Sequence, residues 1–148
     1  MAGRKSRPAA IERDTFVALL KVAGELERQS VELLKEHDLS VTQYNVLRIL
    51  RGAGADGATC GEIASRLIKH DPDVTRLLDR LERRSLVERA RDVADRRVVR
   101  TRITATGLAI LAELDEPVDE LHRRQFGHMS QDALKSLAHL LGEAKTGS

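Results

Sequence analysis

The segment around residues 88–107, ERARDVADRRVVRTRITATG, constrains the fold more than any other part of this sequence. Two runs with strand character, Leu86–Arg91 and Val98–Ile103, flank a polar centre that reads DVADRR. Short strands rich in β-branched residues on either side of a polar turn favour an antiparallel hairpin. The sequence therefore predicts a β-hairpin whose tip carries the tripeptide Asp-Arg-Arg at positions 95–97.

An amphipathic helix rich in arginine is expected immediately before this hairpin. Asp71 is a favoured N-cap and Pro72 a favoured first helical residue, so we expect a helix from Pro72 to about Ser85. Its buried stripe is expected to contain Val74, Leu77, Leu78 and Leu81. At about 100° per residue, the opposite face carries Arg76, Asp79 and Arg83, flanked by Thr75 and Arg80.

Helical periodicity accounts for most of the remaining chain. A long helix is expected over 8–36 from Pro8, with an interruption around Asp14–Thr15 left open. Two capping boxes, Ser40–Gln43 and Thr59–Glu62, then predict helices over 41–51 and 60–68, with Ile63, Ala64 and Leu67 of the second facing inward.

Two further helices are expected at the C-terminal end. Thr104 or Thr106 caps one that runs to about Gln125, with an inward stripe of Leu108, Leu111, Leu114, Val118 and Leu121. Pro117 lies inside it and predicts a kink or break near Asp115, because proline removes a helical hydrogen bond. Ser130 is expected to cap the last helix.

The charge is distributed unevenly along the chain. Net charge is only +2, but residues 59–102 hold 12 Lys and Arg against 8 Asp and Glu, and the remainder holds 13 against 15. Eleven of the 12 are arginine, which pairs with phosphates and guanine edges better than lysine does. This surplus lies where phosphates would be met and agrees with a nucleic-acid partner, and an aromatic content of 2% disfavours a single-strand binder that depends on stacking. The order of an arginine-rich helix followed by a hairpin predicts that this partner is double-stranded DNA.

Size and composition predict one globular domain, 1–148. No segment is apolar and long enough to span a membrane, and the lone Cys60 permits no internal disulfide, so we expect a cytoplasmic protein without membrane contact. The sequence contains no nucleophile–base constellation, no Gly-rich phosphate loop and no histidine pair at helical spacing. We therefore expect no enzyme activity, no cofactor and no metal site.

The predicted order is a mainly α chain with a small β-hairpin wing. This layout resembles the MarR (multiple antibiotic resistance regulator) family of winged helix-turn-helix transcription factors. The resemblance is carried by LSVTQYNVLRIL (39–50), GEIASRL (61–67), DVTRLLDRLERRSLVER (73–89) and DRRVVRTRITATG (95–107). It implies a winged helix-turn-helix DNA-binding region over 39–104 and N- and C-terminal dimerisation helices over 8–36 and 107–144.

The resemblance further implies a homodimer that represses transcription from a pseudo-palindromic operator and is released by a small-molecule effector or by oxidation. The helix over 72–85 would enter a major groove and the wing the adjacent minor groove. The family pattern pairs Asp95 with Arg97 and leaves one wing arginine to insert; which one stays open. Ser85 stands where a helix-ending glycine is common, so a less sharp exit towards the wing is expected.

The expected DNA-binding residues divide by position along the helix. Asp73, Thr75 and Arg76, near its N-terminus, are expected to reach base edges, and Arg80 and Arg83 to meet phosphates. Asp79 is expected to orient Arg76 or Arg83 at helical spacing. The wing would add Asp95, Arg96 and Arg97.

Two alternatives to this interpretation remain at the level of sequence. Cys60 lies in the first turn of a helix, whose dipole favours a thiolate, so a redox-sensing regulator competes with a structural cysteine beside the Gly-rich link. The same scaffold could also serve as a helical protein-interaction module that does not bind DNA. The arginine-rich helix and the intact wing argue against that second alternative.

Overall fold

The computed structural model describes residues 8–147, so residues 1–7 and 148 of the predicted domain lie outside it. The described chain is mostly helical, with one antiparallel hairpin. Its elements are α1 (Ala10–Leu34), α2 (Val41–Ala53), α3 (Cys60–Arg66), α4 (Val74–Arg83), β1 (Val87–Arg91), β2 (Val99–Ile103), α5 (Ala105–Phe126) and α6 (Gln131–Thr146). Short 3₁₀ turns, Lys35–His37 and Gly54–Asp56, follow α1 and α2. The mainly α fold with a hairpin is thereby confirmed.

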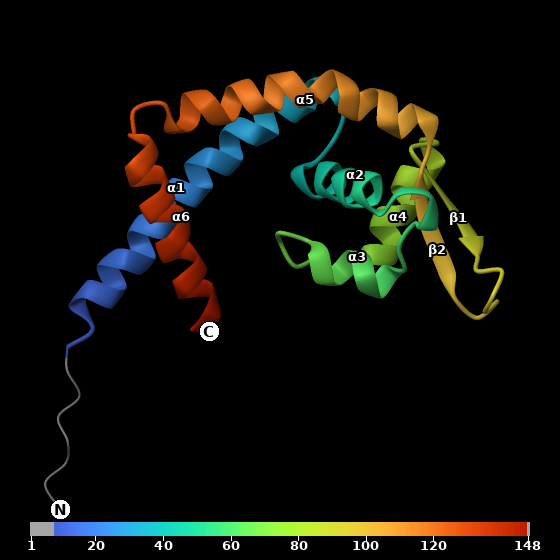
Figure 1. Ribbon diagram of the computed structural model, residues 1–148, viewed down its shortest axis with the longest axis horizontal. Coiled ribbons are helices and arrows are strands. Elements are labelled where there is room, and N and C mark those ends of the chain that lie inside the picture. Colours follow the sequence, from blue (N-terminus) through green and yellow to red (C-terminus); the bar gives the residue numbers. More distant parts are fainter. Residues whose placement is uncertain (1–7, 148) are drawn as a thin grey trace, which may run out of the picture.

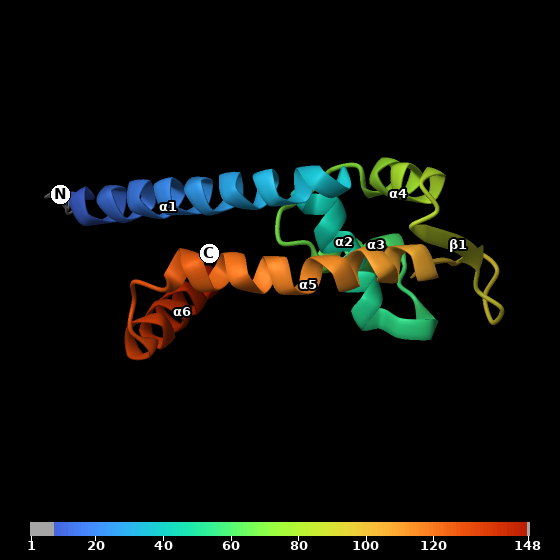
Figure 2. The same ribbon diagram turned by 90° about the horizontal axis from the view of Figure 1, so that it is seen from above.

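The elements form two parts joined by α5. We call residues 39–104 the head and refer to α1, the second half of α5 and α6 as the arm. Figure 1 shows α2, α3, α4 and the hairpin gathered beneath the first half of α5, with the arm reaching away to the other end. Seen from above, α6 turns back on the side of α5 away from α1 (Figure 2).

The core lies where the head meets α5 and the end of α1. Its fully buried members come from every layer of the fold: Leu34, Leu47, Leu50, Ile63, Leu78, Leu81, Leu86, Leu111 and Leu114. The predicted inward face of α4 is confirmed, because Val74, Leu77, Leu78 and Leu81 are all buried. Burial of leucines from α2, α3, α4 and α5 together fixes α4 against the remainder of the head.

Both predicted capping boxes are present. The Ser40 hydroxyl accepts from the Gln43 amide at 3.0 Å, and the Gln43 side chain accepts in return from the Ser40 amide at 3.0 Å. Thr59 and Glu62 make the same exchange at the start of α3. Both helices therefore begin where the sequence predicts, although α2 continues to Ala53 beyond the predicted end at 51.

Helix α3 is shorter than predicted. It ends at Arg66, and Leu67 is extended with φ −62° and ψ 137°. The reason is a contact with α2, because the Ile68 amide donates to the Asn45 side chain at 2.9 Å instead of continuing the helix. Ala64, predicted to face inward, is exposed.

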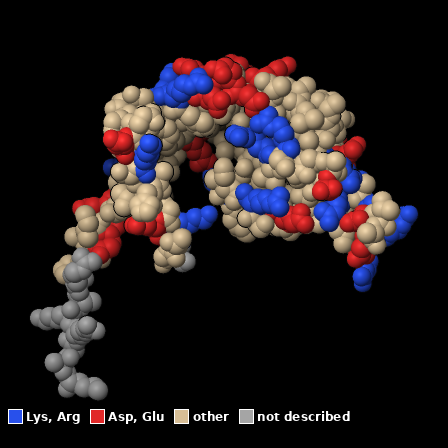
Figure 3. All heavy atoms as spheres, viewed as in Figure 1, with Lys and Arg blue, Asp and Glu red and all other residues tan. Residues whose placement is uncertain are grey.

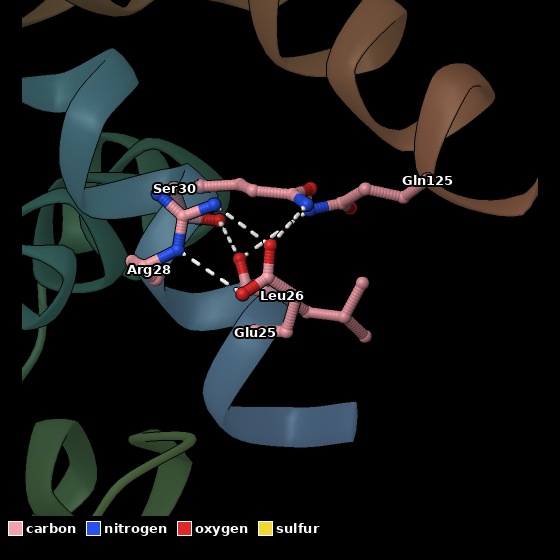
Figure 4. A network of polar contacts seen from close by, with 6 residues as sticks. Glu25, Leu26, Arg28, Ser30 and Gln125 are labelled. Atoms are coloured by element: carbon pink, nitrogen blue, oxygen red, sulfur yellow. Dashed lines mark hydrogen bonds and ion pairs between the residues drawn. The ribbon is translucent and has the colours of Figure 1, made fainter. Parts of the chain in front are cut away.

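Helix α1 begins at Ala10, so Pro8 precedes the N-cap instead of occupying the first turn as predicted. The interruption left open around Asp14–Thr15 is absent: the Thr15 hydroxyl donates to the Ile11 carbonyl at 2.7 Å within a continuous helix. Farther along, α1 is linked to α5. The Gln125 amide nitrogen lies 3.3 Å from the Leu26 carbonyl and 3.1 Å from the Gln29 side-chain oxygen, as Figure 4 shows for the first of these contacts.

The expected break in α5 is wrong. Thr104 is the N-cap, and α5 runs from Ala105 through Pro117 to Phe126 as one helix. Leu111 and Leu114 before the proline and Val118 and Leu121 after it are buried, so packing on both sides holds the helix together. The lost hydrogen bond is tolerable because Pro117 lies on the exposed side. Leu108, predicted to be inward, is 42% exposed, and Gly107 is the buried residue of that turn.

The hairpin pairs Val87 with Ile103 at its base and Arg91 with Val99 near its tip. Ser85, just before it, has a left-handed backbone with φ 59°. The Ser85 amide donates to the Glu82 carbonyl and the Leu86 amide to the Leu81 carbonyl, which is the Schellman pattern of a helix that ends sharply. The less sharp exit expected from a serine is therefore wrong; burial of Leu86, only 2% exposed, requires this turn.

Candidate DNA-binding surface

Helix α4 begins later than the sequence predicts. Asp73, not Asp71, is its N-cap, and the Asp73 carboxylate accepts from the Arg76 amide at 3.0 Å. Asp71 instead accepts from the Asp73 amide at 2.8 Å in the turn before the helix. Asp73, expected at base edges, thus already has a structural role, because capping satisfies an amide at the helix start.

The exposed side of α4 carries an unpaired arginine row. Thr75, Arg76, Arg80 and Arg83 are all exposed, as the helical spacing predicts. Within residues 8–147, the guanidinium groups of Arg76, Arg80 and Arg83 form no ion pair. Three unpaired cations on one face of a helix suit a polyanionic partner.

Asp79 does not orient Arg76 or Arg83, contrary to expectation. Its carboxylate binds Arg89 of β1, with 2.5 Å between Oδ1 and Nη2. The same Arg89 nitrogen lies 2.9 Å from Oε1 of Glu82, and the Arg89 amide donates to Oε2 of Glu82 at 3.0 Å. The side-chain bond from Arg89 lowers the pKa of Glu82 below its ordinary value. Sequence reasoning missed Arg89, although strand alternation places it on the same face as buried Val87.

The wing tip has the ion pair that the family pattern predicts. Oδ1 of Asp95 lies 3.2 Å from Nε of Arg97 and also accepts from the Arg97 amide at 3.1 Å. Arg96 is exposed, and its carbonyl accepts from the Arg91 guanidinium at 2.8 Å. Tip and strands are thus held in shape while the Arg96 side chain projects outward.

A second arginine braces the base of the wing loop from β2. Nε of Arg100 lies 2.9 Å from Oδ2 of Asp92, whose Oδ1 accepts from the Ala94 amide at 2.9 Å. The hydrogen bond from Arg100 is the main cause of a lowered pKa for Asp92. Arg100 also lies 4.0 Å from Glu62 of the α3 capping box, so the wing is linked to α3 as well.

The turn before α4 is held by contacts with α2 and with α1. The Asn45 side chain of α2 holds the Ile68 amide, and Lys69 forms a 2.7 Å ion pair with Glu27 of α1. At the other end of α4, Arg84 donates to the carbonyls of Asp38 and His37 at 2.6 and 3.0 Å. The two partners of each contact are separated by between 23 and 47 positions in the sequence, so no local sequence pattern reveals these contacts.

Charged side chains of both signs are spread over the molecule, with a concentration of acidic groups along the upper edge, over α5 (Figure 3). Basic groups lie on the head and on the projecting wing tip with acidic groups between them, and a further basic cluster lies at one end of the upper edge. The exposed acidic residues of α5 are Glu113, Glu116, Asp119 and Glu120. The face that carries the wing is therefore the more favourable one for phosphates.

A pocket of about 540 Å³ lies where α1, α2, α5 and the turn before α4 meet. Its lining includes Ser30, Leu33, Tyr44, Asn45, Arg48, Ile49, Ile68, Val118, Leu121 and His122. The Arg48 guanidinium carbon lies 5.9 Å from the centre of the Tyr44 ring. Among the described residues, the Tyr44 hydroxyl is buried without a hydrogen-bond partner, so this wall presents an unused polar group.

The remaining candidates have simpler surroundings. Cys60 is partly buried in the first turn of α3 and packs against the core. Between residues 8 and 147, no three His, Cys, Asp or Glu side chains are grouped as metal ligands would be. His37 contacts Glu113, His122 contacts Gln125 and His139 contacts Glu143. No helix in the described part of the chain is both long and apolar enough to cross a membrane.

Three known proteins are similar over most of this chain. The transcriptional repressor IacR of Pseudomonas putida is 30% identical over 126 residues, which cover 85% of this chain and 74% of IacR. A MarR transcription factor from Planctomyces limnophilus has a solved structure with 37% identity and a TM-score of 0.70, covering 94% of this chain and 98% of that one.

A mutant MarR from Escherichia coli, solved in complex with operator DNA, has 26% identity and a TM-score of 0.82, with 94% of this chain and 99% of that chain covered. The family model described as MarR family matches residues 39–99, which lie within the head. Together with the arginine-bearing α4 and the wing, these similarities show that the chain belongs to the MarR family of transcriptional regulators.

Proposed function

We propose that this protein is a cytoplasmic transcriptional repressor that binds a pseudo-palindromic operator as a homodimer. One observation carries the proposal: the unpaired arginine row of α4 and the projecting Arg96 belong to the same head. Neither feature serves the packing of the chain, because both are exposed. A helix and a hairpin that both offer guanidinium groups fit two adjacent grooves of duplex DNA.

The two elements have different tasks in this proposal. Thr75 and Arg76, near the start of α4, reach base edges in the major groove, whereas Arg80 and Arg83 contact phosphates. Asp73 acts as the cap of α4. Arg96 enters the minor groove, because Arg97 is occupied by Asp95 and Arg96 has no such pair among the described residues.

The arm supplies the dimer contact. Its helices leave large apolar side chains exposed in the single chain: Ile11, Phe16, Leu19, Leu20 and Val22 on α1, and Leu140 and Leu141 on α6. No residue of α6 is buried, and Leu134 and Leu137 are only half-buried, so much of its apolar face is left uncovered by its own chain. A two-fold pairing of arms buries both copies at once and places two α4 helices on one face of the duplex.

The pocket beneath α1 is the proposed effector site. Its apolar wall suits a flat organic body, while Arg48 and the unpartnered Tyr44 hydroxyl can bind an anionic or hydrogen-bond-accepting group. Asn45 and Ile68 belong both to this wall and to the tie that holds the turn before α4. A ligand that displaces either residue would move α4 and release the operator.

A footprint of the purified protein on DNA that flanks its own gene tests the proposal. We expect protection of two half-sites about one helical turn apart, with midpoint concentrations that rise steeply with salt. Absence of any protection, together with no binding to duplex DNA at low salt, would favour the alternative of a helical protein-interaction module. Protection of a single half-site by a monomer would contradict the homodimer alone.

A further inference from the structure

The wing is a two-stranded hairpin, and an isolated hairpin of this size does not hold its own direction. Its second strand is held by backbone bonds between Thr101 and Ala58, at 2.8 and 2.9 Å, and by the Arg100 contact with Glu62 of α3. On the first strand Arg89, which pairs with Thr101, is the residue that bonds to α4. It does so at three points: two bonds from its guanidinium and one from its amide.

Arg89 is poorly placed for a phosphate contact of its own. Its side chain is only 22% exposed, and the guanidinium faces two carboxylates, Asp79 and Glu82. A DNA phosphate that approached Nη2 would have to compete with both of these partners. By contrast, Arg76, Arg80 and Arg83 on the same helix are exposed and unpaired.

Asp79 and Glu82 would be unfavourable next to DNA if they were free. They lie on the helix that carries the arginine row, and their side chains are 40% and 41% exposed. A free carboxylate close to a phosphate backbone is repelled by it. Bonding to Arg89 offsets one of these two negative charges and at the same time uses both acids as the anchor for the hairpin.

We propose that Arg89 is a positioning residue for operator binding, which clamps the wing to α4 through Asp79 and Glu82 and does not contact DNA. The inference rests on the proposed DNA-binding function. The clamp sets the angle between the two elements, so that Arg76 and Arg96 can reach adjacent grooves together. Without the clamp, α4 and the wing each keep their structure, but the angle between them no longer matches the spacing of the two grooves.

The first test uses the sign of a charge effect. If these acids matter only as negative charges near DNA, the double variant Asp79→Ala with Glu82→Ala raises operator affinity. If they anchor the clamp, the same variant lowers affinity about tenfold, even though two negative charges are gone. Glu88→Ala is the matched control: Glu88 neighbours Arg89 on β1, is exposed and forms no ion pair within residues 8–147. We expect unchanged or slightly tighter binding for this control.

The second test separates positioning from phosphate contact. Arg89→Gln should weaken operator binding about tenfold. The slope of log affinity against log salt should change by less than the loss of one phosphate contact would change it. A direct phosphate contact would lower that slope by about 0.9. Arg89→Lys keeps the charge but lacks the planar guanidinium whose Nη2 bonds to both carboxylates, so it should rescue affinity only in part. Thermal unfolding of each variant establishes that the loss is not caused by an unfolded head.

A third measurement needs no DNA and therefore distinguishes failure of the clamp from failure of the proposed function. Spin labels at Val93→Cys on the wing and Arg83→Cys on α4, in a Cys60→Ser background, report the distance between the two elements. Labelled chains are diluted with unlabelled protein so that only distances within one chain are measured. The distance distribution should broaden with Arg89→Gln and stay narrow with Glu88→Ala. An unchanged distribution for Arg89→Gln, or tighter DNA binding by the double alanine variant, would overturn the proposal.

Discussion

Asp95 and Arg97 form an ion pair across the tip of the wing, with 3.2 Å between Oδ1 and Nε, and Arg96 stands between them with its side chain exposed. The Arg97 amide bonds to the same carboxylate, so the pair fixes the backbone of the tip as well as one side chain. Two neighbouring arginines thereby acquire different roles, one structural and one available to a partner.

Removal of Arg96 should weaken binding to operator and to scrambled duplex alike. The minor groove distinguishes sequences poorly, and the loss of one cation removes mainly a sequence-independent attraction. We expect Arg96→Ala to lower the slope of log affinity against log salt by about one. Asp95→Ala should weaken binding as a wing variant without removing positive charge, because it frees Arg97. Salt titrations on both DNAs measure this; equal slopes for Arg96→Ala and the parent protein would exclude Arg96 as a DNA contact.

Arg76→Ala should instead affect discrimination. Arg76 lies in the first turn of α4, on the exposed side, where a bidentate contact to a base is worth about 1–3 kcal/mol of discrimination. The affinity for the operator should therefore fall much more than the affinity for scrambled duplex. Fluorescence anisotropy on the two DNAs gives both constants. Equal losses would mean that α4 positions the protein without reading sequence at this residue.

Gly107→Ala should destabilise the fold, although alanine usually stabilises a helix. An added Cβ would lie 2.5 Å from the Leu86 carbonyl oxygen and 2.7 Å from Cγ1 of Ile103. Overpacking of this kind costs about 1–3 kcal/mol. Gly52 in α2 is the matched control, because a Cβ there meets no atom within 4 Å. Gly52→Ala should raise the free energy of unfolding by up to about 1 kcal/mol. Urea denaturation of both variants checks the two opposite signs.

Deletion of residues from Ser130 onward should convert a dimer into a weaker-binding species. The deletion removes α6, whose Leu140 and Leu141 are 58% and 42% exposed in the single chain. Without this face, the arms bury less apolar surface and the two α4 helices lose their fixed spacing. Sedimentation at micromolar concentration measures the change. A stable monomer for the intact chain would contradict the dimer itself, whatever the deletion does.

Cys60→Ser should leave peroxide sensitivity unchanged. Cys60 is the only cysteine of the chain, so no second thiol of the same chain can resolve an oxidised form. Its side chain is partly buried and packs on the core. Operator binding under peroxide challenge compares the two proteins. Release of the parent from DNA, with the serine variant still bound, would establish the redox-sensing alternative.

The features that sequence predicted well depend on residues close together in the chain. Ser40 with Gln43 and Thr59 with Glu62 are three residues apart, so a capping box is visible without knowledge of the fold. The buried stripe of α4 and the order of the elements follow from spacing in the same way. The Asp95–Arg97 pair was expected from the family pattern, and it too is local.

The predictions that failed depend on contacts between distant segments. Helix α3 ended early because Asn45 holds the Ile68 amide. The later start of α4 is an exception, because Asp73 caps the helix through a local bond to the Arg76 amide. Asp79 was expected to act within its own helix, yet its partner Arg89 lies on the neighbouring strand. Ser85 adopts the left-handed turn usually given to glycine because the burial of Leu86 requires it. Local sequence propensity cannot predict a helix end, an ion-pair partner or a backbone conformation that is determined by tertiary packing.

Asn45 and Ile68 line the pocket, and the bond between them also ends α3 and holds the turn that leads into α4. The cavity wall and the support of α4 thus share two residues. Under the proposed function, a substitution of Asn45 that adapts the pocket to a new ligand would also remove the acceptor of the Ile68 amide and so would alter the affinity for DNA. Ligand selectivity and operator affinity are therefore coupled under that function: a change in the compound that binds at this wall would also require a change in the operators.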